Sequence, residues 1–77
     1  MRQIFNKLRW TGARGYFWYV SRGGAGGEEV CSTDEVVEVG ANGVVVRTEG
    51  GEKYIPFHRI VEIRLETGEV LLNRRRR

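Results

Sequence analysis

The sequence predicts an α+β fold in which a short N-terminal helix packs on a curled, mainly antiparallel sheet of about five or six strands, or on a small barrel. Three observations support this prediction. The chain has 77 residues, enough for one small domain. Helical spacing of apolar side chains occurs only near the N-terminus, and short β-branched or aromatic runs separated by glycines follow it. Residues 1–73 are therefore predicted to form a single domain, followed by a basic tail over residues 74–77.

The helix is predicted over residues 2–10. Ile4, Phe5 and Leu8 recur on one side at the helical period, while the basic and amide side chains point largely elsewhere. Two glycines within residues 11–15 end the helix.

Residues 16–22 are the strongest predicted strand, because an unbroken run of aromatic and β-branched side chains favours the pleated conformation. Strand alternation divides these residues between two faces. One face carries Phe17, Tyr19 and Ser21, and the other carries Tyr16, Trp18, Val20 and Arg22. Both faces are aromatic, so either the strand is packed on both sides or one face is an exposed platform for stacking.

The remaining segments are predicted as turns and short strands. Residues 23–27 include four glycines and form a loop, and residues 28–31 form an edge strand. Residues 32–39 begin with Ser/Thr capping chemistry and acids, which favours a short helical turn, although their valines argue for a strand. Glycine turns then separate a meander of strands over residues 44–48, 52–55, 60–65 and 70–73.

Two details of this meander concern the segment around Pro56 and the strand that follows it. Pro56 bars further ladder bonding at the end of its strand, because proline has no backbone N–H. In the strand over residues 60–65, alternation predicts Val61, Ile63 and Leu65 inward, and Glu62, Arg64 and Glu66 outward.

Charge and cysteine content restrict the class of protein. The net charge is +3, and it is unevenly distributed: residues 1–22 carry five bases and no acid, residues 23–73 carry ten acids and four bases, and four arginines follow. Basic ends that meet on one face would attract a polyanion. The single cysteine and single histidine exclude an internal disulfide and a zinc site, so we expect a cytoplasmic protein without cofactor or metal. No apolar run resembles a membrane span or a signal peptide.

Catalytic patterns are weak. A triad of His58 and Asp34 with Ser21 or Ser32 lacks a nucleophile elbow. The glycine loop matches neither a P-loop nor a dinucleotide fingerprint. Cys31 is either a reactive thiol or, as its residue type favours, a small buried apolar residue.

An anion-binding set remains. Arg22 leads into Gly23 and Gly24, whose amides can approach a phosphate closely, and Arg59 offers a planar fork beside His58. The side chains that could stack on unpaired bases are Tyr16, Trp18, Tyr19 and Tyr54. Alternatives stay open: Tyr16 and Trp18 belong to the core, His58 is a turn residue bonded to backbone, or Arg59 pairs with Glu62.

Two motifs carry a resemblance to a known family. The segment Arg22-Gly23-Gly24-Ala25 after an aromatic strand, and Ile55-Pro56-Phe57-His58-Arg59-Ile60, resemble the archaeal RNA cyclic group end recognition domain family over roughly residues 3–72. The resemblance implies that Arg22 and Gly23 belong to one motif and His58 and Arg59 to a second. It also implies binding of RNA ends that bear a 2′,3′-cyclic phosphate, in RNA processing or repair.

The chain departs from the family pattern at two places. Ser21 stands where the family has histidine, and Gly24-Ala25-Gly26 replaces alanine-proline. Two histidines can share acid–base work across a cyclic phosphate, and Ser21 removes one of them, which favours binding over cleavage.

The combined prediction is an RNA-binding module for phosphorylated 3′ ends, and a protein partner in RNA processing is considered beside the RNA. Base stacking is assigned to Tyr19 or Tyr54. The phosphate ligands are Arg22, Gly23, Gly24, His58 and Arg59. The alternatives are a phosphoesterase that uses His58, and a structural or protein-interaction module in which His58 and Arg59 only fix the bend at Pro56.

Overall fold

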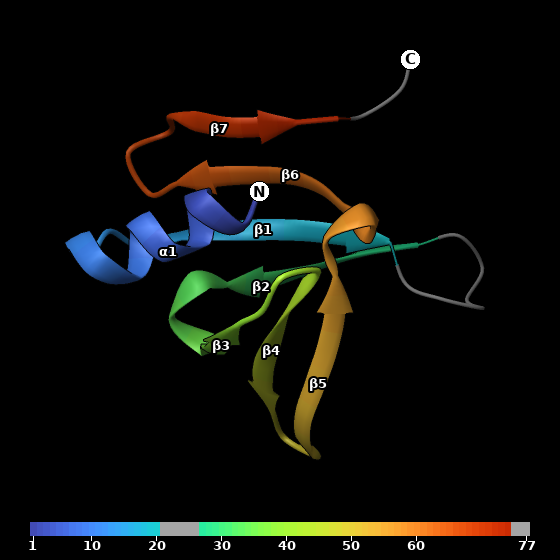
Figure 1. Ribbon diagram of the computed structural model, residues 1–77. Coiled ribbons are helices and arrows are strands. Elements are labelled where there is room, and N and C mark those ends of the chain that lie inside the picture. The colour runs from blue at the N-terminus through green and yellow to red at the C-terminus, as the bar shows by residue number, and fades with distance from the viewer. Residues whose placement is uncertain (21–26, 75–77) are drawn as a thin grey trace.

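The computed structural model describes residues 1–20 and 27–74 (Figure 1). The described residues form one α-helix, two 3₁₀ helices and seven strands. In chain order these are α1 (Arg2–Thr11), β1 (Gly15–Val20), β2 (Glu28–Ser32), η1 (Thr33–Glu35), β3 (Val36–Val39), β4 (Gly43–Thr48), β5 (Gly51–Pro56), η2 (Phe57–Arg59), β6 (Ile60–Leu65) and β7 (Val70–Asn73). Within these ranges no helix is long and apolar enough to cross a membrane.

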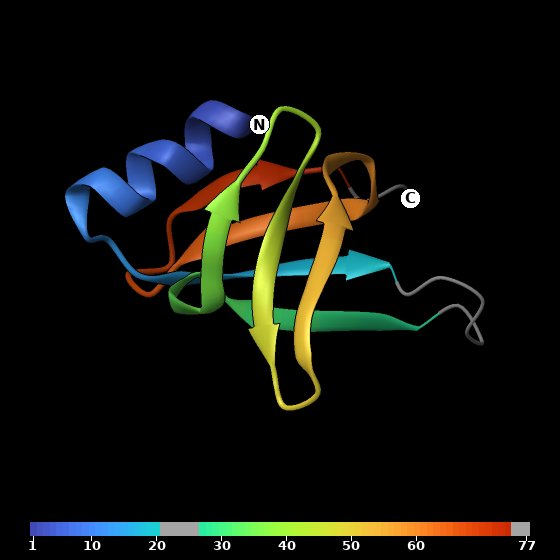
Figure 2. The same ribbon diagram turned by 60° about the horizontal axis from the view of Figure 1, so that its bottom comes forward.

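The strands form two antiparallel sheets. Sheet A has the order β2-β1-β6-β7, and sheet B has the order β3-β4-β5. The strands of sheet B run across those of sheet A, and α1 lies on the same side of sheet A as sheet B (Figures 1 and 2). The predicted α+β class is confirmed, but the strands form two sheets rather than one, and no barrel closes. The two 3₁₀ helices are the corners at which the chain passes between the sheets.

The ambiguous segment 32–39 contains both of the structures that its residue types favoured. The Ser32 side chain accepts a hydrogen bond from the Asp34 backbone N–H at 3.2 Å and so caps η1. The valines then form β3, with Val36 buried. The capping signal and the strand signal are therefore both correct, but for successive halves of the segment.

Three phenylalanines connect the helix, sheet A and the η2 corner. The rings of Phe5 and Phe17 meet edge to face with centroids 5.2 Å apart, and Phe5 stacks on Phe57 at 6.0 Å. Valines and isoleucines of both sheets surround them in the core: Val36, Val44, Val46, Ile55, Ile60 and Ile63.

Strand β1 has one buried face and one exposed face. Phe17 and Tyr19 are buried, whereas Tyr16 is 46% exposed and Trp18 is half-buried. Of the two alternatives for this strand, the described structure favours the exposed face over packing on both sides.

Strand β6 departs from simple alternation. Trp18 pairs with Glu62 and Tyr19 pairs with Ile60, so Val61 is an extra residue, a β-bulge. The bulge lets both Ile60 and Ile63 face the core. Glu62 pairs with Trp18 on the opposite face, so its predicted outward direction is correct, although it is only 4% exposed.

The close approach of β1 to β6 yields a first prediction. A Cβ atom on Gly15 would lie 2.3 Å from the Arg64 carbonyl oxygen, which is backbone and cannot rotate away. We expect Gly15→Ala to lower the free energy of unfolding by about 1–3 kcal/mol, through the strain of overpacking. Gly50→Ala is the matched control, because a Cβ at Gly50 meets nothing within 4 Å. Urea denaturation of both variants measures the difference, and equal midpoints would contradict the close packing.

A second prediction concerns Cys31. Burial, with a smaller contribution from the Glu35 charge, raises the pKa of its thiol to about 11 from the usual 9.0. Because only the thiolate reacts, iodoacetamide at pH 8 should alkylate the folded protein about a hundredfold more slowly than the protein unfolded in guanidinium chloride. The rate should rise with pH towards the raised pKa. Mass spectrometry over a time course measures both rates, and equal rates would mean that the thiol is reactive.

Candidate anion-binding site

The motif Pro56-Phe57-His58-Arg59 forms the η2 corner between β5 and β6. Its first side chain points inward: Phe57 stacks on Phe5, and its backbone N–H donates to the Asn42 carbonyl at 2.9 Å. Ile60, which follows the motif, is fully buried. With both flanks fixed, His58 lies exposed and Arg59 half-buried on the outside of the corner.

Arg74 stabilises the same corner from the end of β7. Its guanidinium donates to the carbonyl oxygens of Phe57 at 2.6 Å and Ile60 at 2.8 Å, and its backbone N–H donates to Val61. A guanidinium suits this position, because it carries several N–H donors and can reach two carbonyl oxygens. Arg74, the first residue of the predicted basic tail, is therefore held by hydrogen bonds although it is exposed, and residues 75–77 lie outside the described part of the chain.

Of the predicted phosphate ligands, the structure describes His58 and Arg59, which are consecutive residues of η2. Arg22, Gly23 and Gly24, as well as Ser21, lie outside the described residues. The last described residue before them is Val20, and its neighbour Tyr19 pairs with Ile60. Strand β1 therefore ends beside Ile60, the residue that directly follows η2.

The side chains of His58 and Arg59 are available to a ligand. Within residues 1–20 and 27–74, no side-chain hydrogen bond or ion pair occupies His58 or Arg59. The carboxylate of Glu62, which was the alternative partner for Arg59, forms an ion pair with Arg64 at 2.5 Å.

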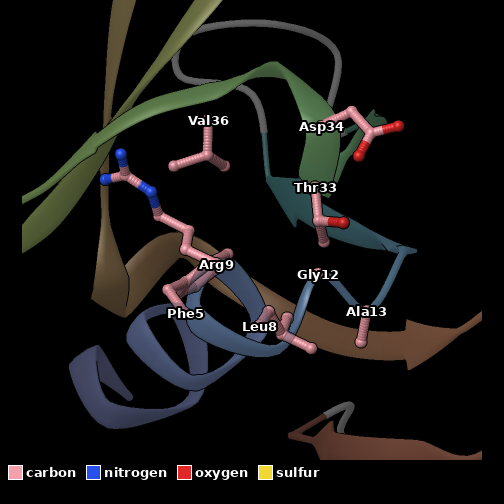
Figure 3. Close-up of a pocket in the computed structure, with 8 residues that line it drawn as sticks. All are labelled: Phe5, Leu8, Arg9, Gly12, Ala13, Thr33, Asp34 and Val36. Carbon is pink, nitrogen blue, oxygen red and sulfur yellow. The ribbon is translucent and has the colours of Figure 1, made fainter.

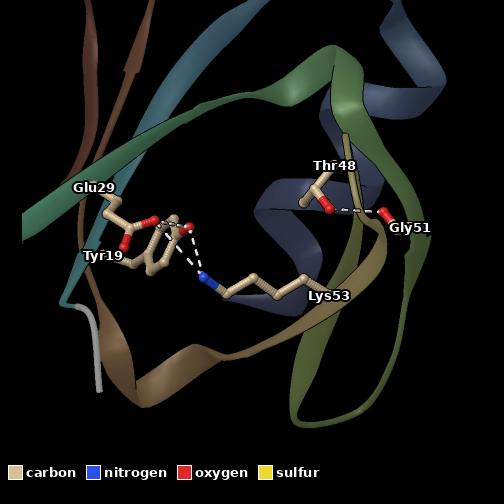
Figure 4. A network of polar contacts seen from close by, with 5 residues as sticks. All are labelled: Tyr19, Glu29, Thr48, Gly51 and Lys53. Carbon is tan, nitrogen blue, oxygen red and sulfur yellow. Dashed lines mark hydrogen bonds and ion pairs between the residues drawn. The ribbon is translucent and has the colours of Figure 1, made fainter. Parts of the chain in front are cut away.

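The stacking role predicted for Tyr19 does not fit its position. Tyr19 is only 6% exposed, and its hydroxyl donates to Glu29 at 2.8 Å and accepts from Lys53 at 3.3 Å (Figure 4). Burial and the hydrogen bond to Glu29 raise the pKa of Tyr19, while the bond to Tyr19 raises the pKa of Lys53. These three side chains join sheet A to sheet B, so the role of Tyr19 is structural.

Tyr54 is accessible and lies two residues before the Pro56–Arg59 motif. It is 55% exposed and comes immediately before Ile55, whose side chain is buried between the sheets, so alternation places Tyr54 on the outer face of sheet B. Its ring covers Gly43, where a Cβ atom would lie 2.7 Å from the Tyr54 ring and hydroxyl. Stacking on Tyr54 stays a prediction.

Two hollows lie among the described residues, and neither is lined by His58 or Arg59. A pocket of about 210 Å³ lies between α1 and η1 (Figure 3), with the charged ends of Arg9 and Asp34 on opposite sides of it. Its other lining residues are Phe5, Leu8, Gly12, Ala13, Thr33 and Val36. Asp34 there pairs with Arg14 at 3.5 Å. A second hollow, between α1 and the turn from β6 to β7, is lined mainly by apolar side chains.

The exposed corner suits a polymer end better than an enclosed small molecule, because small-molecule sites are concave. In the described ranges no group of three or more His, Cys, Asp or Glu side chains converges as a metal site would require. Arg74 is the contributor to the corner that sequence patterns did not identify, since nothing in a run of arginines distinguishes the first.

Three curated Pyrobaculum proteins are similar to the chain over nearly its full length. A UPF0248 protein of Pyrobaculum aerophilum is 75% identical over 76 residues, which is 99% of the chain and 100% of that protein. UPF0248 proteins of Pyrobaculum islandicum and Pyrobaculum calidifontis are 73% and 71% identical, over 97% and 100% of the chain and 89% and 100% of those proteins.

The remaining comparisons add no other family. No family model matches the chain, and no solved structure shows significant similarity to it. The names of the three relatives state no activity, substrate or partner. Similarity at this level over whole chains nevertheless settles membership: the chain belongs to the UPF0248 family of archaeal proteins.

Proposed function

We propose that the chain is a cytoplasmic RNA-binding module and that the η2 corner receives a phosphorylated RNA end, in particular a 2′,3′-cyclic phosphate. One observation carries the proposal: His58 and Arg59 lie adjacent and accessible on a corner whose two flanks are fixed in the core. The resemblance of residues 55–60 to the RNA cyclic group end recognition domain family supports the same ligand.

The rigidity of the corner supports a binding role. Phe57 is held by Phe5 and by the Asn42 carbonyl, and Arg74 bonds to the carbonyls on both sides of His58 and Arg59. Ligand groups held in advance lose less conformational entropy when the ligand binds. Arg59 can donate two parallel hydrogen bonds to a phosphate, and His58 can donate one more to a phosphate or sugar oxygen.

Both basic ends of the chain approach this corner. Phe5 brings the N-terminal half of α1 against η2, and Arg74 brings the start of the arginine tail. Cations near a terminal phosphate would attract the upstream RNA backbone without regard to sequence, and salt would weaken that attraction. Arg22, Gly23 and Gly24 complete the proposed ligand set on the strength of the resemblance.

Cleavage of the phosphate is the less favoured alternative. A cyclic phosphodiester is opened efficiently by a pair of acid–base groups, and His58 is the one histidine of the sequence. We therefore expect no conversion of a cyclic-phosphate oligonucleotide to its phosphomonoester on prolonged incubation. Product that forms with the wild type and not with His58→Ala would overturn this expectation.

End recognition is tested with matched oligoribonucleotides that differ only in the 3′ group: cyclic phosphate, 3′-phosphate or 3′-hydroxyl. We expect the cyclic phosphate to bind at least about tenfold more tightly than the hydroxyl, because charge-assisted hydrogen bonds contribute about 1.5–3 kcal/mol. Fluorescence anisotropy at two salt concentrations measures the affinities. Equal affinity for all three ends would leave only general RNA binding, and absence of binding at low salt would favour a structural module.

The role of Arg59 is tested by truncation. We expect Arg59→Ala to weaken binding of the cyclic-phosphate end about tenfold to a hundredfold, while binding of the hydroxyl end changes less. Arg47→Ala is the control, because Arg47 lies on β4 near the turn into β5, and η2 follows the opposite end of β5 (Figure 2). If Arg59→Ala lowered the unfolding midpoint but left all affinities unchanged, His58 and Arg59 would only fix the bend.

A further inference from the structure

The outer face of sheet A, which points away from α1 and sheet B, carries exposed aromatic and aliphatic side chains. Cross-strand pairing places Tyr16 beside Arg64 on this face and Trp18 beside Glu62 and Val30. No described element covers it (Figure 1). The exposed fractions are substantial: Tyr16 46%, Val20 38%, Val30 55% and Val70 45%.

A buried carboxylate holds a guanidinium among these rings. Arg64 contacts Glu62, which is 4% exposed, and its central carbon lies 5.7 Å from the centroid of the Trp18 ring. The ion pair compensates the charge of Glu62 and restricts the guanidinium to the neighbourhood of the indole. The face therefore presents a tyrosine ring and a guanidinium plane side by side, over a half-buried tryptophan.

We propose that this face is a base-stacking platform for single-stranded RNA, formed by Tyr16, Trp18 and Arg64. The inference rests on the proposed function and extends it from the RNA end to the nucleotides that precede the end. Aromatic rings and arginine planes are the two kinds of side-chain surface on which unpaired RNA bases stack. Neither the family resemblance nor the names of the relatives assign a role to these three residues.

Continuity with the η2 corner argues for RNA as the occupant. Tyr16, Trp18 and Val20 follow one another on this face at about 7 Å per step along β1. Tyr19, between the last two, pairs with Ile60, and Ile60 directly follows Arg59. An RNA strand whose terminal phosphate lies at Arg59 would therefore need to extend along only a few residues of β1 to reach the platform. The polar pair of Arg64 and Glu62 in the middle of the face suits a base better than an apolar protein surface.

The experiment uses Trp18 as its own reporter. In a Trp10→Phe background Trp18 is the sole tryptophan, and Trp10, at 89% exposed on α1, lies away from the platform. The two ligands are hexauridylate ending in a 2′,3′-cyclic phosphate, and uridine 2′,3′-cyclic monophosphate. We expect the hexanucleotide to quench Trp18 emission strongly and the mononucleotide to quench it little.

Tyr16→Leu in this background separates the platform from the corner. We expect it to weaken binding of the hexanucleotide about fivefold to a hundredfold and to leave the affinity for the mononucleotide unchanged, since loss of one stacked base has an effect of this size. Arg59→Ala should weaken both ligands. Calorimetric titration with the hexanucleotide should give the same affinity for the Trp10→Phe protein as for the wild type.

Other results would contradict the platform proposal, and they show whether the proposed function fails with it. If Tyr16→Leu binds the hexanucleotide normally while Arg59→Ala does not, the platform is wrong and the proposed function stands. If the wild type binds neither ligand, both fail. If sedimentation shows an oligomer that Tyr16→Leu dissociates, and RNA leaves Trp18 emission unchanged, the face is an interface between copies of the chain. A thermal melt of Tyr16→Leu confirms that the variant is folded.

Discussion

The contact of Phe5 with Phe17 and Phe57 is the constraint on which the arrangement of the molecule depends. It joins the helix, the central part of sheet A and the corner between the sheets in one cluster. Aromatic pairs of this geometry contribute about 0.5–1.5 kcal/mol beyond the area that they bury. Because Phe57 occupies the inner side of η2, the next two side chains must leave the core. The exposure of His58 is thus a consequence of hydrophobic packing one residue away.

A second link, of opposite chemical character, joins the sheets at the other margin of the core. Lys53 of sheet B reaches the hydroxyl of Tyr19 and the carboxylate of Glu29 on sheet A, with its ammonium 5.0 Å from the centre of the Tyr19 ring. A buried tyrosine hydroxyl needs a hydrogen-bond partner. This need explains why the tyrosine belongs to the framework, although its residue type alone made it a candidate for stacking. Lys53 and Glu29 satisfy it from two different strands.

Sequence patterns predicted the elements better than their assembly. The apolar spacing of Ile4, Phe5 and Leu8 and the alternation along β1 depend on local geometry, and both were correct. Ser32 showed its capping chemistry in the same way. The division into two sheets depends on which strands pair across long stretches of chain, and no local pattern encodes this. The same limit applies to Arg74, whose partners lie fourteen and seventeen residues away in the chain.

Sequence patterns predicted the candidate site only as far as its own motif extends. Proline and the alternating apolar residues around it marked the corner at residues 56–59, and the structure describes His58 and Arg59 there, accessible. The distinction between Tyr19 inside and Tyr16 outside required knowledge of which face of β1 meets the helix. Both faces are aromatic, so composition did not distinguish them. The packing of Phe17 against Phe5 decides between the two faces.

The bulge at Val61 has a consequence for how the family can vary. The extra residue shifts the alternation of side chains along β6 by one position. Ile60 before the bulge and Ile63 after it therefore both face the core, while Glu62 and Arg64 face outward. Deleting a single residue from this stretch would move either the aliphatic pair out of the interior or the ionic pair into it. Homologous chains should therefore tolerate many side chains at the bulge itself but conserve the number of residues between the histidine and the arginine of β6. The spacing between these two residues, more than the identity of any residue between them, is what selection would preserve.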